Sequence, residues 1–254
     1  MENFKHAGRG ATNTTVSASA SLDVLSRVKG RAPRVQCLTN TVAQAITANC
    51  LLAIGGRVSM AVHPAEIVDM TAGADAVLIN LGTIDPLREE AVRRLIDEPS
   101  LQAKPWVLDP VFVEASPLRL ALARRVAEDR HVILRANMSE ADALRAVLAA
   151  VDQDRVTWVI TGAIDRVVAG ERRTECRRGH PMMARITGLG CALGAIIAAF
   201  RAVEPDPFVA SAAALTVFGA AGERAARVSQ GPGSFAVAFV DALSAIDVDA
   251  MEIR

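Results

Sequence analysis

The chain has 254 residues, of which 51% are hydrophobic, and its 28 basic residues balance 28 acidic ones. Balanced charge provides no field to attract nucleic acid or an anionic membrane surface, and the apolar run that ends before Arg201 is too short to span a bilayer. Four cysteines without a CxxC pair favour reduced thiols in a cytoplasmic protein.

Residues 1–20 are rich in Ser, Thr, Ala and Gly and lack an apolar segment, so we expect a flexible tail followed by a single domain over residues 21–254. Short apolar runs then alternate with helical patterns. The expected strands are 35–38, 58–62, 76–81, 106–108, 131–134 and 156–160. The expected helices are 21–29, 44–54, 65–71, 86–96, 117–128 and 139–149.

The last third of the chain leaves this alternation. Residues 166–169 and 173–176, joined by Gly170-Glu171, predict an antiparallel hairpin at a sheet edge. An apolar helix after Thr187, a helix over 208–228, a tight turn at 231–234 and a helix over 235–246 follow. Because nearly all strand residues are apolar, the strands must be buried on both faces. This predicts an α/β fold with a mostly parallel central sheet and helices on both faces.

Polar residues stand where five of the strands end: Asn40, Gly82-Thr83, Asp109, Asn137 and Thr161-Gly162. Each of them alone is explained equally well as a turn former or a helix cap. In a parallel sheet, however, the carboxyl ends of the strands share one edge, where ligands bind. Five polar strand ends in a row favour a binding site at that edge.

The segment Gly188-Leu189-Gly190 opens the apolar helix that begins near Cys191. Closely spaced glycines let the backbone turn and aim its N–H groups at one point, and the first N–H groups of a helix lack partners. Together with the helix dipole they predict an anion hole, with Cys191 as an acid/base or hydrogen-bonding side chain at its mouth. The alternative is a glycine turn that caps a buried helix, with Cys191 as a small apolar residue.

The motifs of the chain, taken together, resemble those of the hydroxyethylthiazole kinases of the ribokinase-like superfamily. They follow the same order from about Val35 to the end of the chain: Leu38-Thr39-Asn40, Thr47-Ala48-Asn49, Asn80-Leu81-Gly82-Thr83, Leu108-Asp109-Pro110-Val111, Arg135-Ala136-Asn137-Met138-Ser139-Glu140, Thr161-Gly162-Ala163-Ile164-Asp165, Gly179-His180-Pro181, Thr187-Gly188-Leu189-Gly190-Cys191 and Gly231-Pro232-Gly233-Ser234-Phe235.

The resemblance implies a three-layer ribokinase-like fold and ATP-dependent phosphorylation of the hydroxyl of 4-methyl-5-(2-hydroxyethyl)thiazole, a step of thiamine salvage. It also implies Mg²⁺ and a homotrimer with sites between subunits. Carried over by motif, the ATP contacts are Arg135, Asn137 and Thr161, the carboxylates that hold Mg²⁺ and its waters are Asp109 and Glu140, and the thiazole contacts are Asn40, Met60 and Gly188.

Cys191 stands where most ribokinase-like kinases have an Asp that acts as base, and the thiazole kinases share this cysteine. We expect a lowered pKa for a thiol at a helix N-terminus. Phosphoryl transfer is loose and the hydroxyl loses its proton late, so positioning, Mg²⁺ and the anion hole should supply most of the acceleration.

Three places depart from the family pattern. Phe112-Val113-Glu114 replaces a small, glycine-containing loop, Leu189 replaces a small residue between two glycines, and the segment 146–155 is shorter. Phe112 and Leu189 are expected to crowd the site. Two alternatives therefore stay open, a kinase for another small hydroxylated acceptor and a non-catalytic ligand-binding protein. The intact set of Asp109, Glu140, Arg135 and Cys191 favours catalysis.

Overall fold

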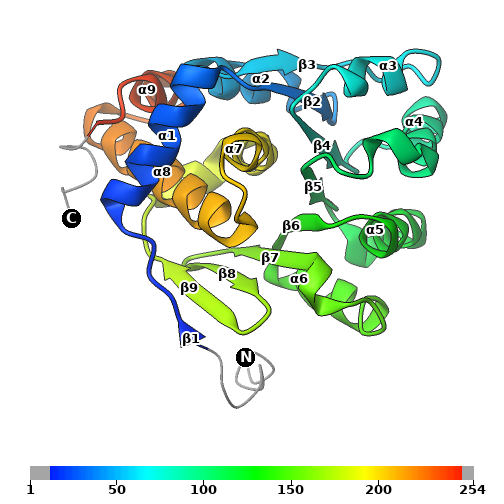
Figure 1. The fold of residues 1–254 in the computed structure, drawn as a ribbon. Coiled ribbons are helices and arrows are strands. Elements are labelled where there is room, and N and C mark those ends of the chain that lie inside the picture. The colour runs from blue at the N-terminus through cyan, green and yellow to red at the C-terminus, as the bar shows by residue number, and fades with distance from the viewer. Residues whose placement is uncertain (1–11, 248–254) are drawn as a thin grey trace.

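The computed structural model describes residues 12–247. These residues form one nine-stranded sheet with the strand order β1-β9-β8-β7-β6-β5-β4-β2-β3 (Figure 1). The parallel part comprises β2 (Arg34–Leu38), β3 (Arg57–Ser59), β4 (Ala76–Asn80), β5 (Trp106–Asp109), β6 (Val132–Asn137) and β7 (Val156–Thr161). The antiparallel hairpin β8 (Asp165–Ala169) and β9 (Arg172–Cys176) extends the sheet beyond β7.

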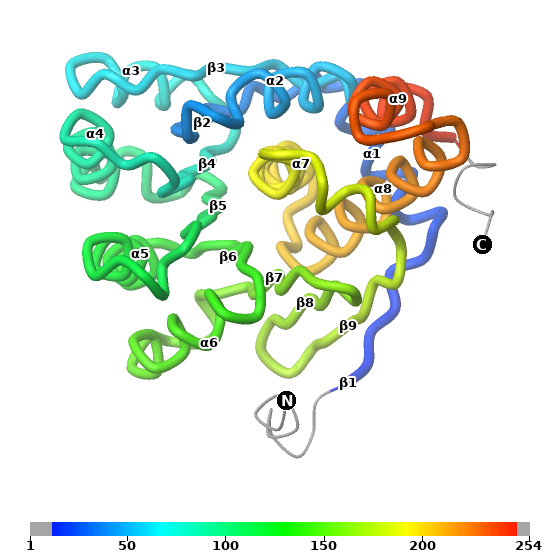
Figure 2. The backbone as a smooth tube through the Cα atoms, turned by 180° about the vertical axis from the view of Figure 1, so that it is seen from behind, coloured from blue at the N-terminus to red at the C-terminus, as the bar shows by residue number. Residues whose placement is uncertain are grey.

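Helices cover both faces of this sheet, as Figures 1 and 2 show from opposite sides. One layer contains α1 (Ala18–Arg31), α2 (Gln44–Ala53), α7 (Leu189–Val203), α8 (Pro207–Val228) and α9 (Pro232–Ser244), and it encloses the larger apolar core. The other contains α3 (Ile67–Ala72), α4 (Pro86–Asp97), α5 (Pro117–Asp129) and α6 (Met138–Val147) over a second core. The predicted three-layer α/β architecture is confirmed.

Several helices begin at a polar cap followed by proline. The side chains of Asp85, Ser116 and Asp206 accept hydrogen bonds from backbone N–H groups in the first turns of α4, α5 and α8. Each cap precedes a proline at the first helical position, where the missing N–H costs nothing and φ is already helical. The sequence thus sets the starts of these helices locally.

The structure differs from the predicted tail at residues 12–20. Thr12–Asn13 form β1, a two-residue strand that pairs with β9, and Ser17 caps α1, which begins at Ala18. Backbone atoms make the β1 contacts, for example Thr12 N–H to the carbonyl of Glu171 at 2.8 Å. Because composition reports on side chains, it gives no signal for such pairing. The rest of the predicted tail, residues 1–11, lies outside the described residues.

Other boundaries shift as well, and β6, for example, continues to Asn137 rather than ending at residue 134. β3 ends at Ser59 rather than residue 62, and beyond it the amide Nε2 of Gln36 donates to the carbonyl of Ala61 at 2.8 Å. α9 begins inside the predicted turn because Pro232 occupies its first position.

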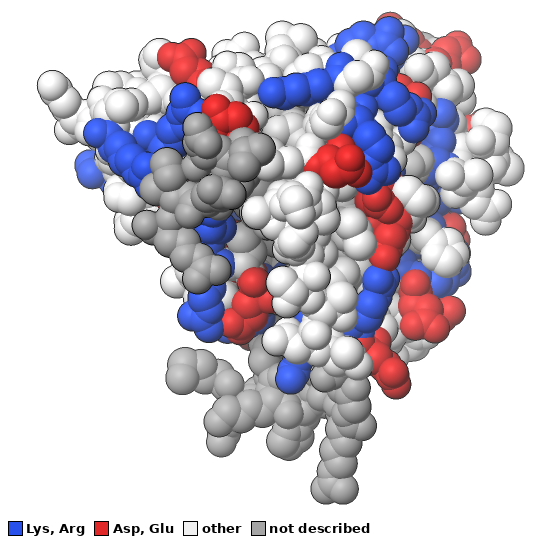
Figure 3. Space-filling model, turned by 60° about the vertical axis from the view of Figure 1, so that its left-hand side comes forward, with Lys and Arg blue, Asp and Glu red and all other residues white. Residues whose placement is uncertain are grey.

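Basic and acidic side chains lie side by side on the face shown in Figure 3. Ion pairs among the described residues include Arg27 with Glu204 and Arg172 with Asp206, both at 2.6 Å. Within residues 12–247, no helix combines the length and apolarity needed to cross a bilayer.

Candidate active site

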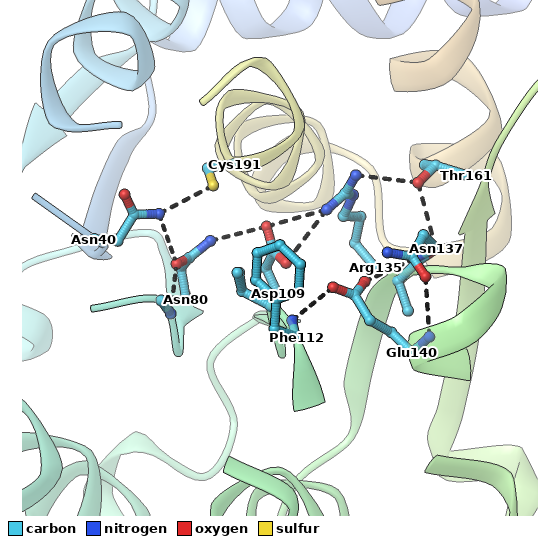
Figure 4. A network of polar contacts seen from close by, with 12 residues as sticks. Asn40, Asn80, Asp109, Phe112, Arg135, Asn137, Glu140, Thr161 and Cys191 are labelled. Atoms are coloured by element: carbon cyan, nitrogen blue, oxygen red, sulfur yellow. Dashed lines mark hydrogen bonds and ion pairs between the residues drawn. The ribbon is translucent and has the colours of Figure 1, made fainter. Parts of the chain in front are cut away.

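Four polar side chains at the carboxyl ends of adjacent strands point to the same face of the sheet. Asn80, Asp109, Arg135 and Thr161 lie at or near the ends of β4, β5, β6 and β7. The residue before each of them packs in the core under α3 to α6. Because strand side chains alternate between faces, the four polar side chains face α7 instead (Figure 4). Asp109 and Thr161 of the predicted polar edge belong to this set, and Asn80 and Arg135 complete it.

The N-terminus of α7 lies above these strand ends. Gly188 caps the helix with φ +83°, and a Cβ there would come within 2.9 Å of Ala43 and Ile46 on the α2 side, so glycine is required. The N–H of Leu189 donates to the carbonyl of Ile186 at 3.4 Å. Among the described residues, the N–H groups of Gly190 and Cys191 have no acceptor. The free donors of the predicted anion hole thus include these two, whereas the N–H of Leu189 is used within the turn.

Arg135 places a second positive group at this helix end. Its Nη1 lies 3.3 Å from Oδ1 of Asp109, and its Nη2 donates to Oγ1 of Thr161 at 3.0 Å. A Cβ on Gly190 would lie only 2.7 Å from the same Nη2, so the guanidinium packs directly against the first turn of α7. A guanidinium beside the positive end of a helix dipole is favourable where an anion binds to both. This geometry indicates a site for phosphate.

Asp109 is fully buried beneath that site. It accepts a hydrogen bond from Nδ2 of Asn80 at 2.9 Å. Burial raises the pKa of Asp109 to about 6, although the charge of Arg135 lowers it, and the charge of Glu140 raises it further. The carboxylate is therefore held in a place that favours its protonated form.

The raised pKa predicts how stability varies with pH. Between the ordinary pKa of 3.8 and the folded pKa of about 6, the folded chain binds the extra proton. Folding stability therefore falls as pH rises through this window, by an amount on the order of 2–3 kcal/mol at about 1.4 kcal/mol per pKa unit. Asp109→Asn cannot titrate, so urea unfolding should show wild-type stability falling relative to the variant from pH 4 to pH 7. A stability difference that is constant with pH would contradict this.

Glu140 joins the loop after β5 to the start of α6. Its Oε1 accepts from the N–H of Phe112 and its Oε2 from the N–H of Asn137, both at 2.8 Å. Asn137 in turn accepts from the N–H of Glu140 at 2.9 Å, which completes a capping box. The side chain of Asn137 is thus engaged as a helix cap in this structure.

The carboxylates near Arg135 constrain how a metal ion could bind. Within residues 12–247, no group of three or more His, Cys, Asp or Glu side chains is arranged to hold an ion. Asp109 and Glu140 are close enough that one charge raises the pKa of the other. Mg²⁺ commonly binds one or two carboxylates together with water and substrate phosphates. The two carboxylates therefore fit a cation that shares its ligands with a bound phosphate.

Cys191 is hydrogen-bonded through two asparagines to Asp109 (Figure 4). Nδ2 of Asn40 donates to Sγ of Cys191 at 3.1 Å and to Oδ1 of Asn80 at 3.0 Å. Burial, followed by the charge of Asp109, raises the pKa of Cys191, although the two asparagines and Arg135 lower it. The expectation of a lowered thiol pKa is therefore wrong, because burial outweighs the favourable neighbours.

The expectation that Leu189 crowds the site is also wrong. Its side chain is 3% exposed and belongs to the larger apolar core, so it points into the protein. Met60 is half-buried and directly follows β3, the last strand of the sheet order, whereas Asn40 follows β2 and belongs to the hydrogen-bonded cluster. The structure thus joins Asn40 to Cys191 and places Met60 at the sheet edge.

The loop after Asp109 keeps a glycine-like backbone without glycine. Val111 has φ +28° and Phe112 has φ +53°, in the left-handed region that costs an L-residue roughly 1–2 kcal/mol. The side chain of Phe112 is 64% exposed, so it does not fill the buried part of the site. The predicted bulk at this loop is present, but it projects towards solvent.

Phe112→Gly is expected to stabilise the fold by about 0.5–1 kcal/mol. Relief of left-handed strain, roughly 1–2 kcal/mol, exceeds the entropic cost of glycine, about 0.5–1 kcal/mol. Phe112→Ala removes the same ring but keeps the strain, so it is the matched control and should not be stabilised. Urea unfolding at pH 7 measures both, and equal effects of the two substitutions would exclude strain as the cause.

The prediction missed one residue of the site, Asn80, which it named only as part of a motif. Asn80 is buried between Asn40 and Asp109, and a Cβ on Gly82 would lie 3.0 Å from both Asn40 and Asn80. The expected strand ran on to Leu81, which made Asn80 part of its interior. An asparagine within an otherwise apolar buried run was the available signal, since buried amides need partners.

Known proteins are similar in sequence to this chain over almost its whole length. The model of the hydroxyethylthiazole kinase family matches residues 25–151 and 140–249. The two matches overlap within the region that includes the start of the segment 146–155, whose predicted shortening stays a prediction. A relative from Agrobacterium fabrum, described as a probable hydroxyethylthiazole kinase, is 41% identical over 230 residues, which is 91% of each chain.

Solved structures share the fold. A hydroxyethylthiazole kinase from Pyrococcus horikoshii superposes with a TM-score of 0.87 at 32% identity, covering 93% of this chain and 97% of that one. A ribokinase-like superfamily protein from Enterococcus faecalis shares the fold alone, with a TM-score of 0.64 at 16% identity and coverage of 93% and 96%. The predicted ribokinase-like fold is confirmed, and the chain belongs to the hydroxyethylthiazole kinase family.

Proposed function

We propose that this protein transfers the terminal phosphoryl group of ATP to the hydroxyl of 4-methyl-5-(2-hydroxyethyl)thiazole, a step of thiamine salvage. The observation that carries the proposal is the convergence of Arg135 and the unpartnered N–H groups of Gly190 and Cys191 at the start of α7. Family membership and the hydrogen bond between Asn40 and Cys191 support it.

In this proposal each residue has a distinct task. Arg135 and Thr161 bind the phosphates of ATP, with the capped loop at Asn137 beside them. The free N–H groups of α7 stabilise the charge on the transferred phosphoryl group, where preorganised donors have the largest effect. Gly188, Asn40 and Met60 position the thiazole, and Sγ of Cys191 receives the proton that the acceptor hydroxyl loses when its oxygen bonds to phosphorus.

Asp109 and Glu140 would hold Mg²⁺ jointly with the phosphates. The ion would supply positive charge that neutralises the phosphate oxygens. Its presence would also remove the repulsion between the two carboxylates, which contributes to the raised pKa of Asp109. Isothermal titration of Mg²⁺ into the protein with ATP, into the protein alone and into ATP alone tests this arrangement, because shared ligands require tighter Mg²⁺ binding with protein and ATP together than with either one alone.

The activity is tested by ADP release from Mg-ATP with hydroxyethylthiazole, with 4-methyl-5-ethylthiazole, and with no addition. The ethyl compound lacks only the hydroxyl and is the matched control. Turnover with hydroxyethylthiazole alone supports the proposal. Turnover only with another small alcohol would replace it by a kinase for that acceptor, and tight thiazole binding without any turnover would make the protein a ligand-binding descendant.

We further propose that the protein acts as a cytoplasmic homotrimer from a single kinase domain. Leu52 on α2 and Val237 on α9 are 57% and 65% exposed. These two helices contact each other, so a neighbouring subunit would bury apolar side chains there. A second subunit would also complete the site around Met60 at the sheet edge. Light scattering coupled to size-exclusion chromatography should give three times the chain mass of 26.8 kDa.

A further inference from the structure

The orientation of the buried amide of Asn80 is defined by its neighbours. Its Oδ1 accepts from the N–H of Gly82 and from Nδ2 of Asn40, both at 3.0 Å. Its Nδ2 donates to Oδ2 of Asp109 at 2.9 Å. A backbone N–H can only donate, so the bond from Gly82 identifies the oxygen end of the amide and leaves the nitrogen end facing the carboxylate.

The same reasoning defines the amide of Asn40. Its Oδ1 accepts from the N–H of Ala43 at 2.9 Å, so its Nδ2 carries the two hydrogens that face the site. One hydrogen reaches Asn80 and the other reaches Sγ of Cys191 at 3.1 Å. The sulfur therefore accepts a hydrogen bond, which stabilises its unprotonated form. The charged groups that act on this sulfur are Asp109 and Arg135.

We propose that Asn80 is a positioning residue for phosphoryl transfer: it holds Asn40 with an N–H turned towards Sγ of Cys191, and it holds Asp109 in place with its own N–H. Asn80 is fully buried, so it acts on the reaction through these two neighbours rather than by touching a substrate. The expected effect of Asn80 on catalysis rests on the proposed function. The expected effect of Asn80 on the thiol of Cys191 does not, because it can be measured without any substrate.

The first test measures the thiol itself. Cys191 is half-buried and partly accessible, while the other three cysteines, Cys37, Cys50 and Cys176, are buried. Iodoacetamide at pH 8, followed by peptide mass spectrometry, therefore gives the alkylation rate of Cys191. Asn80→Leu should slow this rate about three- to tenfold, because Asn40 loses the partner that fixes its amide, and thiolate character controls the reaction. The slowing should shrink in an Asn40→Ala background.

The second test measures turnover. Asn80→Leu should lower kcat about tenfold and change KM for ATP and for hydroxyethylthiazole by less than threefold, which a residue acting by contact with either substrate would not do. Asn80→Asp keeps acceptors for Gly82 and Asn40 but replaces the N–H given to Asp109 by a second buried carboxyl oxygen, so it should lose kcat and also unfold at a lower urea concentration than the wild type. Thr47→Val is the control, because its buried Oγ1 has no partner and the replacement has the same shape.

The two measurements separate the positioning role from the proposed function. If the wild type phosphorylates hydroxyethylthiazole but both Asn80 variants keep its alkylation rate and its kcat, the positioning role is overturned and the proposed function stands. A wild type that fails to phosphorylate hydroxyethylthiazole overturns the proposed function, while slower alkylation in Asn80→Leu would still support the arrangement of the thiol. A higher KM with unchanged kcat in the Asn80 variants would contradict the positioning role and indicate that Asn80 contacts a substrate.

Discussion

Replacing Arg135 with alanine is expected to lower kcat/KM about 100- to 1000-fold, the range for loss of one preorganised donor to a developing charge. The guanidinium lies between the first turn of α7 and Asp109, and its side chain is only 15% exposed. The same change leaves the buried carboxylate without its cation. Breaking such a pair costs about 3–5 kcal/mol, so the variant should also unfold at lower urea concentrations.

Two features make this expectation specific. The stability loss should shrink as the pH falls towards about 6, because the pKa of Asp109 without its cation lies above the wild-type value and the variant takes up a proton while the wild type is still ionised. Arg135→Lys keeps the charge but not the forked geometry and should recover stability more than turnover. Arg94→Ala removes an exposed arginine paired with Glu90 and is the control for a surface ion pair. Full activity in Arg135→Ala would remove this residue from the phosphate site.

Replacing Cys191 with alanine is expected to reduce turnover about 10- to 100-fold, the lower end of general-base effects. Because the pKa of Cys191 is raised, mainly by burial, little thiolate is present at neutral pH. Wild-type kcat should therefore increase with pH above neutrality. Cys191→Asp supplies a base that is ionised at neutral pH, so its turnover at pH 7 should equal or exceed that of the wild type, with a flatter alkaline limb.

The control for this pair of variants is Cys176→Ala, which removes a buried thiol of β9 outside the site. It should leave the pH profile of kcat unchanged. An unchanged rate in Cys191→Ala would show that the proton leaves the acceptor by another route. An alkaline limb that persists in Cys191→Asp would assign the titration to a different group.

The placement of the polar site could be predicted because it follows from period-two alternation in buried parallel strands. Apolar runs that end at Asp109, Arg135 and Thr161 imply strands whose last polar side chains gather at one edge, and the register pairs Asn80 directly with Asp109. Similarly, two closely spaced glycines at the start of an apolar helix implied free N–H groups, which the structure provides at Gly190 and Cys191.

What could not be predicted depends on contacts between distant segments. The pKa of Cys191 is set by burial under elements far apart in the sequence, so its helix position alone gave the wrong direction. The inward direction of Leu189 follows from how α7 packs, which no local pattern records. The left-handed backbone at Val111 and Phe112 could not be predicted, because no glycine stands at either position. A hydrogen bond from the N–H of Phe112 to Glu140, which is distant in sequence, holds the loop in this conformation.

The close fit of Gly188 against Ala43 and Ile46 has a consequence for how substrates meet. Because not even a methyl group fits between Gly188 and these two side chains, the turn before α7 packs closely against the segment that follows Asn40. Under the proposed function, Asn40 lies on the acceptor side and the turn on the phosphate side, so the separation of the two sides is fixed when the chain folds.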